Sequence, residues 1–189
     1  MQSQKKWGLI IALAVLVILV FSMMSWFVGT RNSLVSMDEE INAAWAEIDN
    51  QLQRRSDLIP NLVNTVKGYA SQEEEIFTRI AEARSKLAGA TSVGEKAQSY
   101  NEMQSALSRL LVVVENYPNL KSNENFKELQ YELAGTENRL AVARKRYNER
   151  VRDFNRRIRM FPASIVANML GFEQREYFEI EESAREVPE

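Results

Sequence analysis

Hydrophobic and polar positions divide the chain into one uninterrupted apolar run and a longer region with helical periodicity. The run WGLIIALAVLVILVFSMMSWFV, residues 7–28, carries no charge and lies between Lys6 and Arg31. At about 1.5 Å per residue it is roughly 33 Å long, enough to cross a hydrocarbon core of about 30 Å. We therefore predict a transmembrane helix. A cleaved signal peptide is the alternative, but the run is longer than a typical signal core and no clear small-x-small site follows it.

The charges on either side of this run predict its orientation. Lys5, Lys6 and the amino terminus precede it, whereas Arg31 is the only basic residue after it until Arg54. The positive-inside rule then places residues 1–6 in the cytoplasm and the rest of the chain outside, in the periplasm of a diderm bacterium. We therefore predict a single-pass protein of the cytoplasmic membrane, which in a diderm bacterium is the inner membrane.

Beyond the run, apolar positions recur with a period near 3.5 residues. Steps of three and four residues connect apolar positions from 41 to 87, from 97 to 114 and from 126 to 161. This period predicts long amphipathic helices that pack along their length with coiled-coil-like geometry. The first of these apolar seams keeps its phase through Pro60, so this residue marks either a kink in one long helix or a tight break between two.

Capping residues and breakers predict where the helices begin and end. Ser92 and Glu95 have capping-box spacing for a second helix at about 95–117. Pro118 disfavours helical geometry before it, and Ser122 or Asn123 can cap the third helix, so the segment between the two helices is a corner. Further along, Pro162 is expected to end the third helix and Gly171 to end the short apolar turn SIVANML.

Together these elements predict an all-α fold. An N-terminal transmembrane helix is followed by a bundle of three or four long helices, with the first helix kinked or broken near Pro60. No stretch alternates with a period of two, so no sheet is predicted. We divide the chain into cytoplasmic residues 1–6, the transmembrane helix 7–28, the bundle 29–172 and an acidic tail 173–189.

The residue types present narrow the function. The chain has no Cys and no His, which excludes Cys or His nucleophiles, Ser-His triads, thiolate or imidazole zinc sites and Glu-x-x-His di-iron centres. The carboxylates at 73–75 and Glu115 remain, but consecutive helical residues point in different directions and offer few oxygens to one centre. We therefore predict no enzyme, no cofactor and no metal site. A hydrolase that uses Glu115 or Glu137 requires a cleft that gathers carboxylates from different helices.

Polar side chains inside the apolar seams need partners, because a buried unpaired charge is costly. Arg55 and Glu73 lie too far apart on the first seam to pair with each other, so each is expected to find a partner on another helix. We predict a structural polar network that fixes helix register, with a ligand site or an oligomer contact as alternatives. Its predicted members are Arg55, Asp57, Asn61, Glu73, Glu115, Asn116, Glu137, Arg144 and Asn148. Within it, Glu115 is expected to pair with Arg55, Arg139 or Arg144.

Basic residues are concentrated between Arg139 and Arg159. Nine Arg or Lys minus two Asp or Glu give this segment a net charge of +7, whereas residues 173–189 have a net charge of −5. Such a helix could bind anionic lipid head groups or nucleic acid, or it could be neutralised by acidic neighbours in the protein. A periplasmic location disfavours nucleic acid. The residues predicted to contact an anionic surface are Lys145, Arg146, Arg152, Arg156, Arg157 and Arg159.

Three long motifs occur in order along the chain: LQRRSDLIPNLVNTVKGYA at 52–70, LLVVVENYPNLKSNENFKELQ at 110–130 and GTENRLAVARKRYNERVRDFNRRIRMFP at 135–162. Together they resemble the LemA family of bacterial proteins over residues 31–178. The resemblance implies an N-terminal membrane segment followed by a helical bundle and, through a magnetosome-membrane relative, membrane shaping or scaffolding. Many members carry a lipobox-like Cys near the anchor, whereas SWFVGTRNSL has none, so lipid attachment is not implied here.

These observations favour a single-pass membrane-anchored scaffold or adaptor of the bacterial envelope that acts by homo-oligomerisation and protein contacts. The first seam is longer than a short second helix can cover, which leaves apolar surface for another subunit. The run LLVVV at 110–114 is apolar on more than one face, so we expect it to be buried within the bundle or at a subunit contact. The alternative is an anionic-lipid or polyanion-binding module built on residues 139–159. The expected partners are a second copy, other envelope proteins and the bilayer around residues 7–28.

Overall fold

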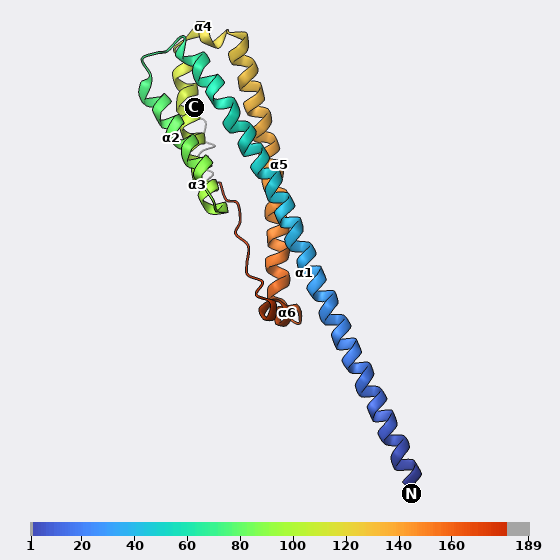
Figure 1. Cartoon of the computed structure of the whole chain (residues 1–189). Helices are drawn as coiled ribbons and strands as arrows, with labels where there is room; N and C mark the ends of the chain where they lie inside the picture. The colour runs from blue at the N-terminus through green and yellow to red at the C-terminus, as the bar shows by residue number, and fades with distance from the viewer. Residues whose placement is uncertain (1, 181–189) are drawn as a thin grey trace. The chain divides into compact units, whose positions relative to one another are not determined.

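The computed structural model describes residues 2–180, with side chains described from residue 7 onward, and it contains no strand within that range (Figure 1). The helices are α1 (Gln2–Lys67), α2 (Glu74–Gly89), α3 (Val93–Val114), α4 (Pro118–Lys121), α5 (Glu124–Arg159) and α6 (Ala163–Leu170). The all-α fold predicted from the apolar period is therefore confirmed.

Helix α1 continues through Pro60 and ends at Lys67. The chain turns after Gly68, where the N–H groups of Tyr69 and Ala70 both donate to the carbonyl of Val66 at 2.9 Å. A helix ends readily near a glycine, because glycine has a low intrinsic helix propensity. Of the two alternatives for Pro60, one helix that continues through this residue is the one found, and the chain leaves the helix only at residues 68–73.

The helix passes Pro60 because the carbonyl that proline leaves without a donor is satisfied from another helix. Proline has no backbone N–H, so the carbonyl of Ser56, four residues earlier, has no partner within α1. Arg84 on α2 donates from Nε to this carbonyl at 3.1 Å and to the Ser56 hydroxyl at 3.2 Å. The carbonyl of Ser56 would cost free energy if it were buried without a partner. Its hydrogen bond from Arg84 removes that cost and connects α1 with α2.

Because α1 ends at Lys67, the seam from 41 to 87 is divided between α1 and α2. Its aliphatic positions on α1 are no more than 2% exposed, at Ile41, Ile48, Leu52, Ile59, Leu62 and Val66. The expectation that this seam leaves uncovered apolar surface for another subunit is therefore wrong, because the chain's own helices cover it.

The ends of α3 follow from local hydrogen bonding. At its start the Ser92 hydroxyl accepts from Glu95 N at 3.1 Å, while the Glu95 carboxylate accepts from Ser92 N at 3.1 Å and from Thr91 N at 2.8 Å. The predicted capping box is thus confirmed. The helix ends at Val114, three residues earlier than predicted, because the N–H groups of residues 115–117 bond to carbonyls three residues back.

The corner that follows contains the short helix α4. Of the two predicted caps for the next helix, Asn123 is the one used, since its Oδ1 accepts from Phe126 N at 3.0 Å. At the other end of the chain, α6 ends at Gly171, whose φ of 72° is the left-handed conformation predicted for this glycine stop.

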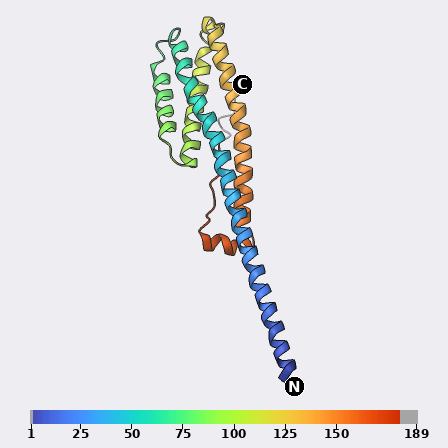
Figure 2. The same ribbon diagram turned by 45° about the vertical axis from the view of Figure 1, so that its right-hand side comes forward.

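By packing, the chain divides into two units. The anchor unit comprises residues 2–40 and 152–175, and the bundle unit comprises residues 41–151 and 176–180. In the bundle unit, parts of α1 and α5 pack with α2, α3 and α4 (Figure 2). Its largest fully buried side chains are Ile48, Ile59, Leu62, Ile80, Tyr100, Met103, Leu110, Leu120, Phe126 and Phe178.

The anchor unit contains the apolar N-terminal part of α1. Its apolar segment is long and apolar enough to cross a membrane, and none of it is buried by other parts of the chain. Burial begins just after the run, at Thr30 (5% exposed) and Leu34 (0%). Within the same unit, Arg175 pairs with Asp38 through two hydrogen bonds, of 2.8 and 2.9 Å.

The beginning of the predicted acidic tail packs against α5. Tyr147 donates from its hydroxyl to the carbonyl of Glu176 at 2.9 Å. Asn148 donates to the carbonyl of Phe178 at 3.1 Å and accepts from the N–H of Phe178 at 2.9 Å. The Phe178 ring is fully buried and lies 5.7 Å from the ring of Trp45. Residues 181–189 of the predicted tail lie outside the described residues, and the predicted domain limits stay a prediction.

Candidate functional site

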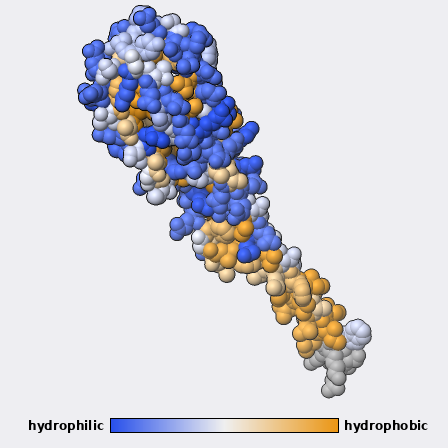
Figure 3. All heavy atoms as spheres, turned by 45° about the horizontal axis from the view of Figure 1, so that its top comes forward, coloured by the Kyte–Doolittle hydropathy of each residue, from blue (hydrophilic) through white to orange (hydrophobic). Residues whose placement is uncertain are grey.

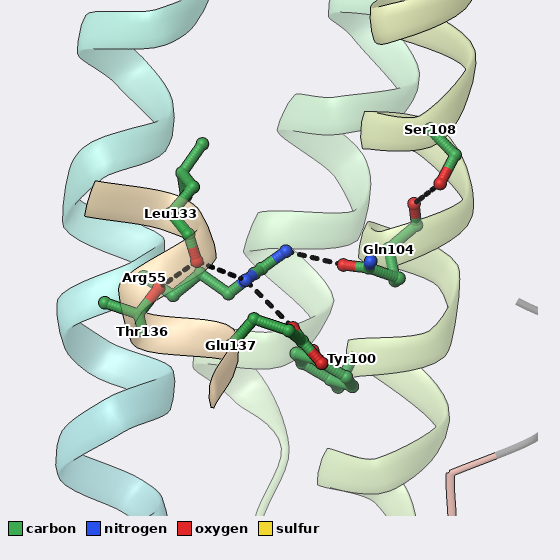
Figure 4. Close-up of polar contacts among 7 residues, drawn as sticks. All are labelled: Arg55, Tyr100, Gln104, Ser108, Leu133, Thr136 and Glu137. Carbon is green, nitrogen blue, oxygen red and sulfur yellow. Dashed lines mark hydrogen bonds and ion pairs between the residues drawn. The ribbon is translucent and has the colours of Figure 1, made fainter. Parts of the chain in front are cut away.

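A buried arginine occupies the centre of the bundle unit. Arg55 on α1 is 5% exposed and reaches α3 and α5 at once (Figure 4). One terminal nitrogen lies 2.9 Å from a carboxylate oxygen of Glu137 and 3.1 Å from the carbonyl of Leu133. The other donates to Gln104 at 2.6 Å. One guanidinium thus connects three helices, because its planar fork presents several donors in fixed directions.

Tyr100 completes the cluster on α3. Its hydroxyl donates to the Glu137 carboxylate, and the Arg55 guanidinium lies 5.8 Å from the centroid of its ring. Burial raises the pKa of the Tyr100 hydroxyl above its ordinary value; the nearby Arg55 opposes this shift and Glu137 adds to it. The hydroxyl therefore stays protonated and remains a donor to Glu137 over the physiological pH range.

Three members of this cluster were not among the predicted network residues: Tyr100, Gln104 and Thr136. All three have polar groups and stand at seam positions of their helices. Thr136 is fully buried and donates to the Leu133 carbonyl at 2.8 Å, the same carbonyl that Arg55 contacts. The signal that identified Arg55, a polar residue within an apolar seam, could have identified them as well.

Other residues of the predicted network lie away from this cluster. Asp57, Asn61 and Asn116 are exposed, and Asp57 accepts from Gln53 on its own helix at 3.0 Å. Glu73 is half-buried at the residue before α2 and makes no side-chain cap hydrogen bond there. These four residues therefore do not join the cluster around Arg55, and the side-chain bond from Gln53 to Asp57 lies within α1.

The predicted partners of Glu115 are wrong. Its carboxylate, 64% exposed, pairs with Lys121 on α4 and not with Arg55, Arg139 or Arg144. The early end of α3 explains the difference, because Glu115 follows the last helical residue and lies in the corner. This exposed pair contributes little to stability.

On α5, the predicted face of Glu137, Arg144 and Asn148 serves different contacts. Glu137 pairs with Arg55, as above. Arg144 is half-buried and lies close enough to Tyr100 to oppose the rise in that residue's pKa. Asn148 holds the main chain of Phe178. The face therefore joins the cluster at one end and the described part of the tail at the other.

The polar groups of the Arg55 cluster bond mainly to one another. Both terminal nitrogens of Arg55 have acceptors from the protein itself, while its Nε has none. Between residues 2 and 180 no group of three or more Asp or Glu side chains could hold a metal ion. A buried arginine bonded to acceptors on two other helices is the arrangement expected of a group that sets helix register.

A groove in the bundle unit lies between α2, α3 and the segment 176–180. Its volume is about 1060 Å³. The lining has both signs of charge, from Arg79, Lys86, Arg109, Glu82, Glu102, Glu176 and Glu179. Lys86 and Glu102 pair with each other at 2.6 Å, and the mixed lining offers no single-signed surface that would select a ligand.

The predicted anionic-surface residues are exposed, but several are already paired. In the bundle unit Arg146 lies 3.4 Å from Glu47, and Lys145 is exposed. In the anchor unit Arg152 and Arg156 share Asp153, at 3.3 and 3.5 Å. Beside them, Arg157 is exposed and Arg159 donates to the carbonyl of Asn155 at 3.2 Å.

The fold and the cluster define a class: an all-helical protein with a long apolar N-terminal helix and a bundle held by a buried polar cluster. The model of the LemA family matches residues 44–189, most of the chain, so this protein belongs to the LemA family. The family resemblance of the three motifs is thereby confirmed.

Named relatives agree with this assignment. The chain is 27% identical over 205 residues to the magnetosome protein MamQ 2 of Paramagnetospirillum magneticum strain AMB-1, covering 93% of this chain and 75% of the relative. It is 25% identical to the magnetosome protein MamQ of Magnetospirillum gryphiswaldense, covering 95% and 75%. The protein LemA of Metamycoplasma hominis is 26% identical, with 84% and 73% covered. This chain is therefore a membrane-associated bacterial protein.

Proposed function

We propose that this protein is a non-catalytic, membrane-anchored scaffold or adaptor of the bacterial envelope that acts through homo-oligomerisation and protein contacts. The polar cluster around Arg55 supports a structural role, because its groups bond to one another and carry none of the residue types of a nucleophile or a zinc site. The magnetosome relatives are consistent with a role at a membrane.

The observation that carries the oligomer is an exposed apolar pair on α3. In the run LLVVV, Leu110 and Val114 are buried, but Leu111 and Val112 are 41% and 58% exposed. The run was predicted to be buried within the bundle or at a subunit contact. The bundle buries only part of it. A second copy that covers this pair would remove it from water, at roughly 25 cal/mol per Å² of apolar area.

The oligomer is tested by measuring the mass of the full chain in detergent. We expect the wild type to be a dimer or larger at micromolar concentration and the L111S/V112S double variant to be a monomer. Val142→Ser on α5 is the matched control, because Val142 is also 51% exposed and lies outside the run. A monomeric wild type, or a control that dissociates equally, contradicts the proposed contact.

We further propose that residues 7–28 cross the inner membrane once, with residues 1–6 in the cytoplasm and the bundle unit outside. The exposed apolar part of α1 and the flanking charges support this topology. Because the chain has no Cys, Tyr131→Cys creates a unique thiol at a position that is 79% exposed. A membrane-impermeant maleimide should label it in intact cells, whereas Ser3→Cys should react only after lysis; the reverse result would invert the topology.

A second candidate function is binding to anionic lipid through the end of α5. Its supporting observation is that Arg156, Arg157 and Arg159 are all exposed within three residues of the helix end. Anionic head groups attract such side chains with about 1 kcal/mol each.

Native mass spectrometry of the full chain with bound lipids tests this candidate. Reversal of the three arginines to Glu should remove bound phosphatidylglycerol while leaving phosphatidylethanolamine unchanged. Reversal of three lysines elsewhere provides a control with the same change in charge: Lys86, Lys121 and Lys127, whose side chains are 60%, 59% and 44% exposed. Equal loss of anionic lipid in both triple variants would leave only a general charge effect and reject the specific surface.

A further inference from the structure

Helix α6 in the anchor unit has two apolar faces. One face is covered by the protein, with Ala163, Val166 and Ala167 at most 1% exposed. The other carries Phe161, just before the helix, and Ile165 and Met169 on it. These side chains are 80%, 49% and 69% exposed. On the helix, the spacing of four residues places Ile165 and Met169 on one face, and Phe161 lies in the turn just before it. These three exposed side chains are called the stripe below. A stripe of large apolar side chains in water lacks the partner that the other face has.

Helix α6, which carries most of the stripe, lies near the part of α1 that follows the apolar run. In Figures 1 and 2, α6 lies beside α1, and the same packing unit contains both. Burial on α1 begins at Thr30 and Leu34, two and six residues after the run ends at Val28. At about 1.5 Å per residue these positions are roughly 3 to 9 Å beyond the hydrocarbon core, within the head-group layer of a bilayer.

The surroundings of the stripe suit a membrane surface. Residues 152–175 contain five Arg and two acidic residues, a net charge of +3. Met160 and Leu170, at the two ends of the stripe, are also exposed, at 52% and 42%. Figure 3 shows further apolar surface next to the apolar part of α1. Apolar side chains next to arginines are typical of helices that lie in the interface of a bilayer.

We propose that Phe161 and helix α6 form a second membrane contact, in which Phe161, Ile165 and Met169 enter the head-group region of the same bilayer that α1 crosses. The occupant of the stripe is thus lipid, and continuity with the apolar part of α1 within the anchor unit argues for it. This inference rests on the proposed transmembrane helix. With two contacts, the anchor unit is held in a fixed orientation on the membrane, whereas α1 alone would leave it free to tilt.

The test uses single thiols in the full chain, reconstituted one copy per nanodisc of uncharged phosphatidylcholine. Phe161→Cys, Ile165→Cys and Met169→Cys are each labelled with bimane, and each can be placed without removing a native thiol because the chain has none. Leu19→Cys, within the apolar run, is the lipid reference, and Tyr131→Cys, 79% exposed in the bundle unit, is the water reference. Quenching is measured with aqueous iodide and with lipid that carries a nitroxide near its head group.

We expect the three stripe positions to lose iodide quenching relative to Tyr131→Cys and to gain quenching by the lipid nitroxide. Iodide quenching equal to that of Tyr131→Cys overturns the proposal. Protection from both quenchers also overturns it, because the cover is then protein, and repetition with two copies per disc tests whether that protein is a second copy. If Leu19→Cys is itself open to iodide, the transmembrane helix has failed and the second contact fails with it. The uncharged bilayer separates this contact from anionic-lipid binding by the arginines.

Discussion

The contact between Arg84 and the carbonyl of Ser56 predicts an energetic coupling between Arg84 and Pro60. Arg84→Met removes the donor that replaces the missing N–H of proline. Ser56 is 8% exposed, so its carbonyl has little access to water. A buried acceptor left unpaired costs about 1–3 kcal/mol. Because Arg84 itself is only half-buried, we expect a loss of about 1.5 kcal/mol in the free energy of unfolding, near the lower end of that range.

The same substitution should cost less when position 60 has an N–H. In the Pro60→Ala background the backbone N–H at position 60 can donate to Ser56 within the helix, so the carbonyl keeps a partner without Arg84. We then expect Arg84→Met to cost about 0.5 kcal/mol, which leaves a coupling of about 1 kcal/mol between the two positions.

Urea unfolding of the full chain in dodecyl maltoside measures these free energies. Trp45 is a suitable probe of the bundle unit, since its ring lies 5.4 Å from the ring of Tyr147 and 5.7 Å from that of Phe178. Replacing Trp7 and Trp26 by Phe leaves it as the single tryptophan.

A matched control defines the result that would refute this reasoning. Arg79→Met changes another arginine of α2, one that is 49% exposed and pairs with Glu75 within the helix. It should cost less than about 0.5 kcal/mol in both backgrounds. If Arg84→Met costs the same with and without Pro60, the carbonyl of Ser56 is not what Arg84 satisfies.

Three further predictions concern the cluster, the tail and the cap. Glu137→Gln should destabilise the protein by about 2 kcal/mol, because it leaves the buried guanidinium of Arg55 without its anion. This cost is below that of a fully buried pair, since Glu137 is 39% exposed. Arg55→Met should cost less, because it removes the buried charge itself. Urea unfolding that ranks the two variants in the opposite order would contradict this. Asn148→Ala should speed hydrogen exchange of the Phe178 amide by about tenfold, as expected for a lost hydrogen bond of about 1.4 kcal/mol; unchanged exchange measured by mass spectrometry would show that the tail is held otherwise. Hydrogen bonds from the N–H groups of Thr91 and Ser92 lower the pKa of Glu95 below its ordinary value of 4.5. The folded state therefore binds fewer protons at this site, so the stability it contributes is present above pH 4.5 and is lost as the pH falls through the folded-state pKa. The difference in urea midpoint between wild type and Glu95→Gln should shrink accordingly, and a pH-independent difference would argue against the cap.

The helices could be predicted because their signals are local. The apolar period, the Ser92–Glu95 spacing and Gly171 act within a few residues, and the structure realises each of them. The position of the break after α1 could not be read from the seam, since the apolar phase continues across the turn at 68–73. The break was predicted near Pro60 because proline disrupts helices more strongly than glycine. The carbonyl that Pro60 leaves without a donor is bonded by Arg84, and this contact depends on the tertiary fold.

The site could be predicted only in part for the same reason. A charged residue within an apolar seam indicated that Arg55 needs a partner, but the sequence does not say which helix faces it. Glu137 and Gln104 are both polar residues on other segments, and only packing selects them. Burial of Phe178 was not predicted, because residues 173–189 are mostly acidic and polar and were interpreted as a tail. One apolar residue in such a segment gives no periodic pattern.

The hydrogen bonds from Tyr147 and Asn148 to the segment 176–178 end on its main chain. Tyr147 and Asn148 contact the carbonyl of Glu176 and the N–H and carbonyl of Phe178. Main-chain groups are the same for nearly every amino acid, so this attachment does not depend on the side chains of exposed residues such as Tyr177. Evolution can therefore change those outward side chains without detaching the segment, provided that a large apolar residue stays at position 178. In an alignment of LemA proteins we expect variable residues at 176, 177 and 179 beside an invariant pair at 147 and 148, which would make this strip a place where new binding specificities arise at little cost to the fold.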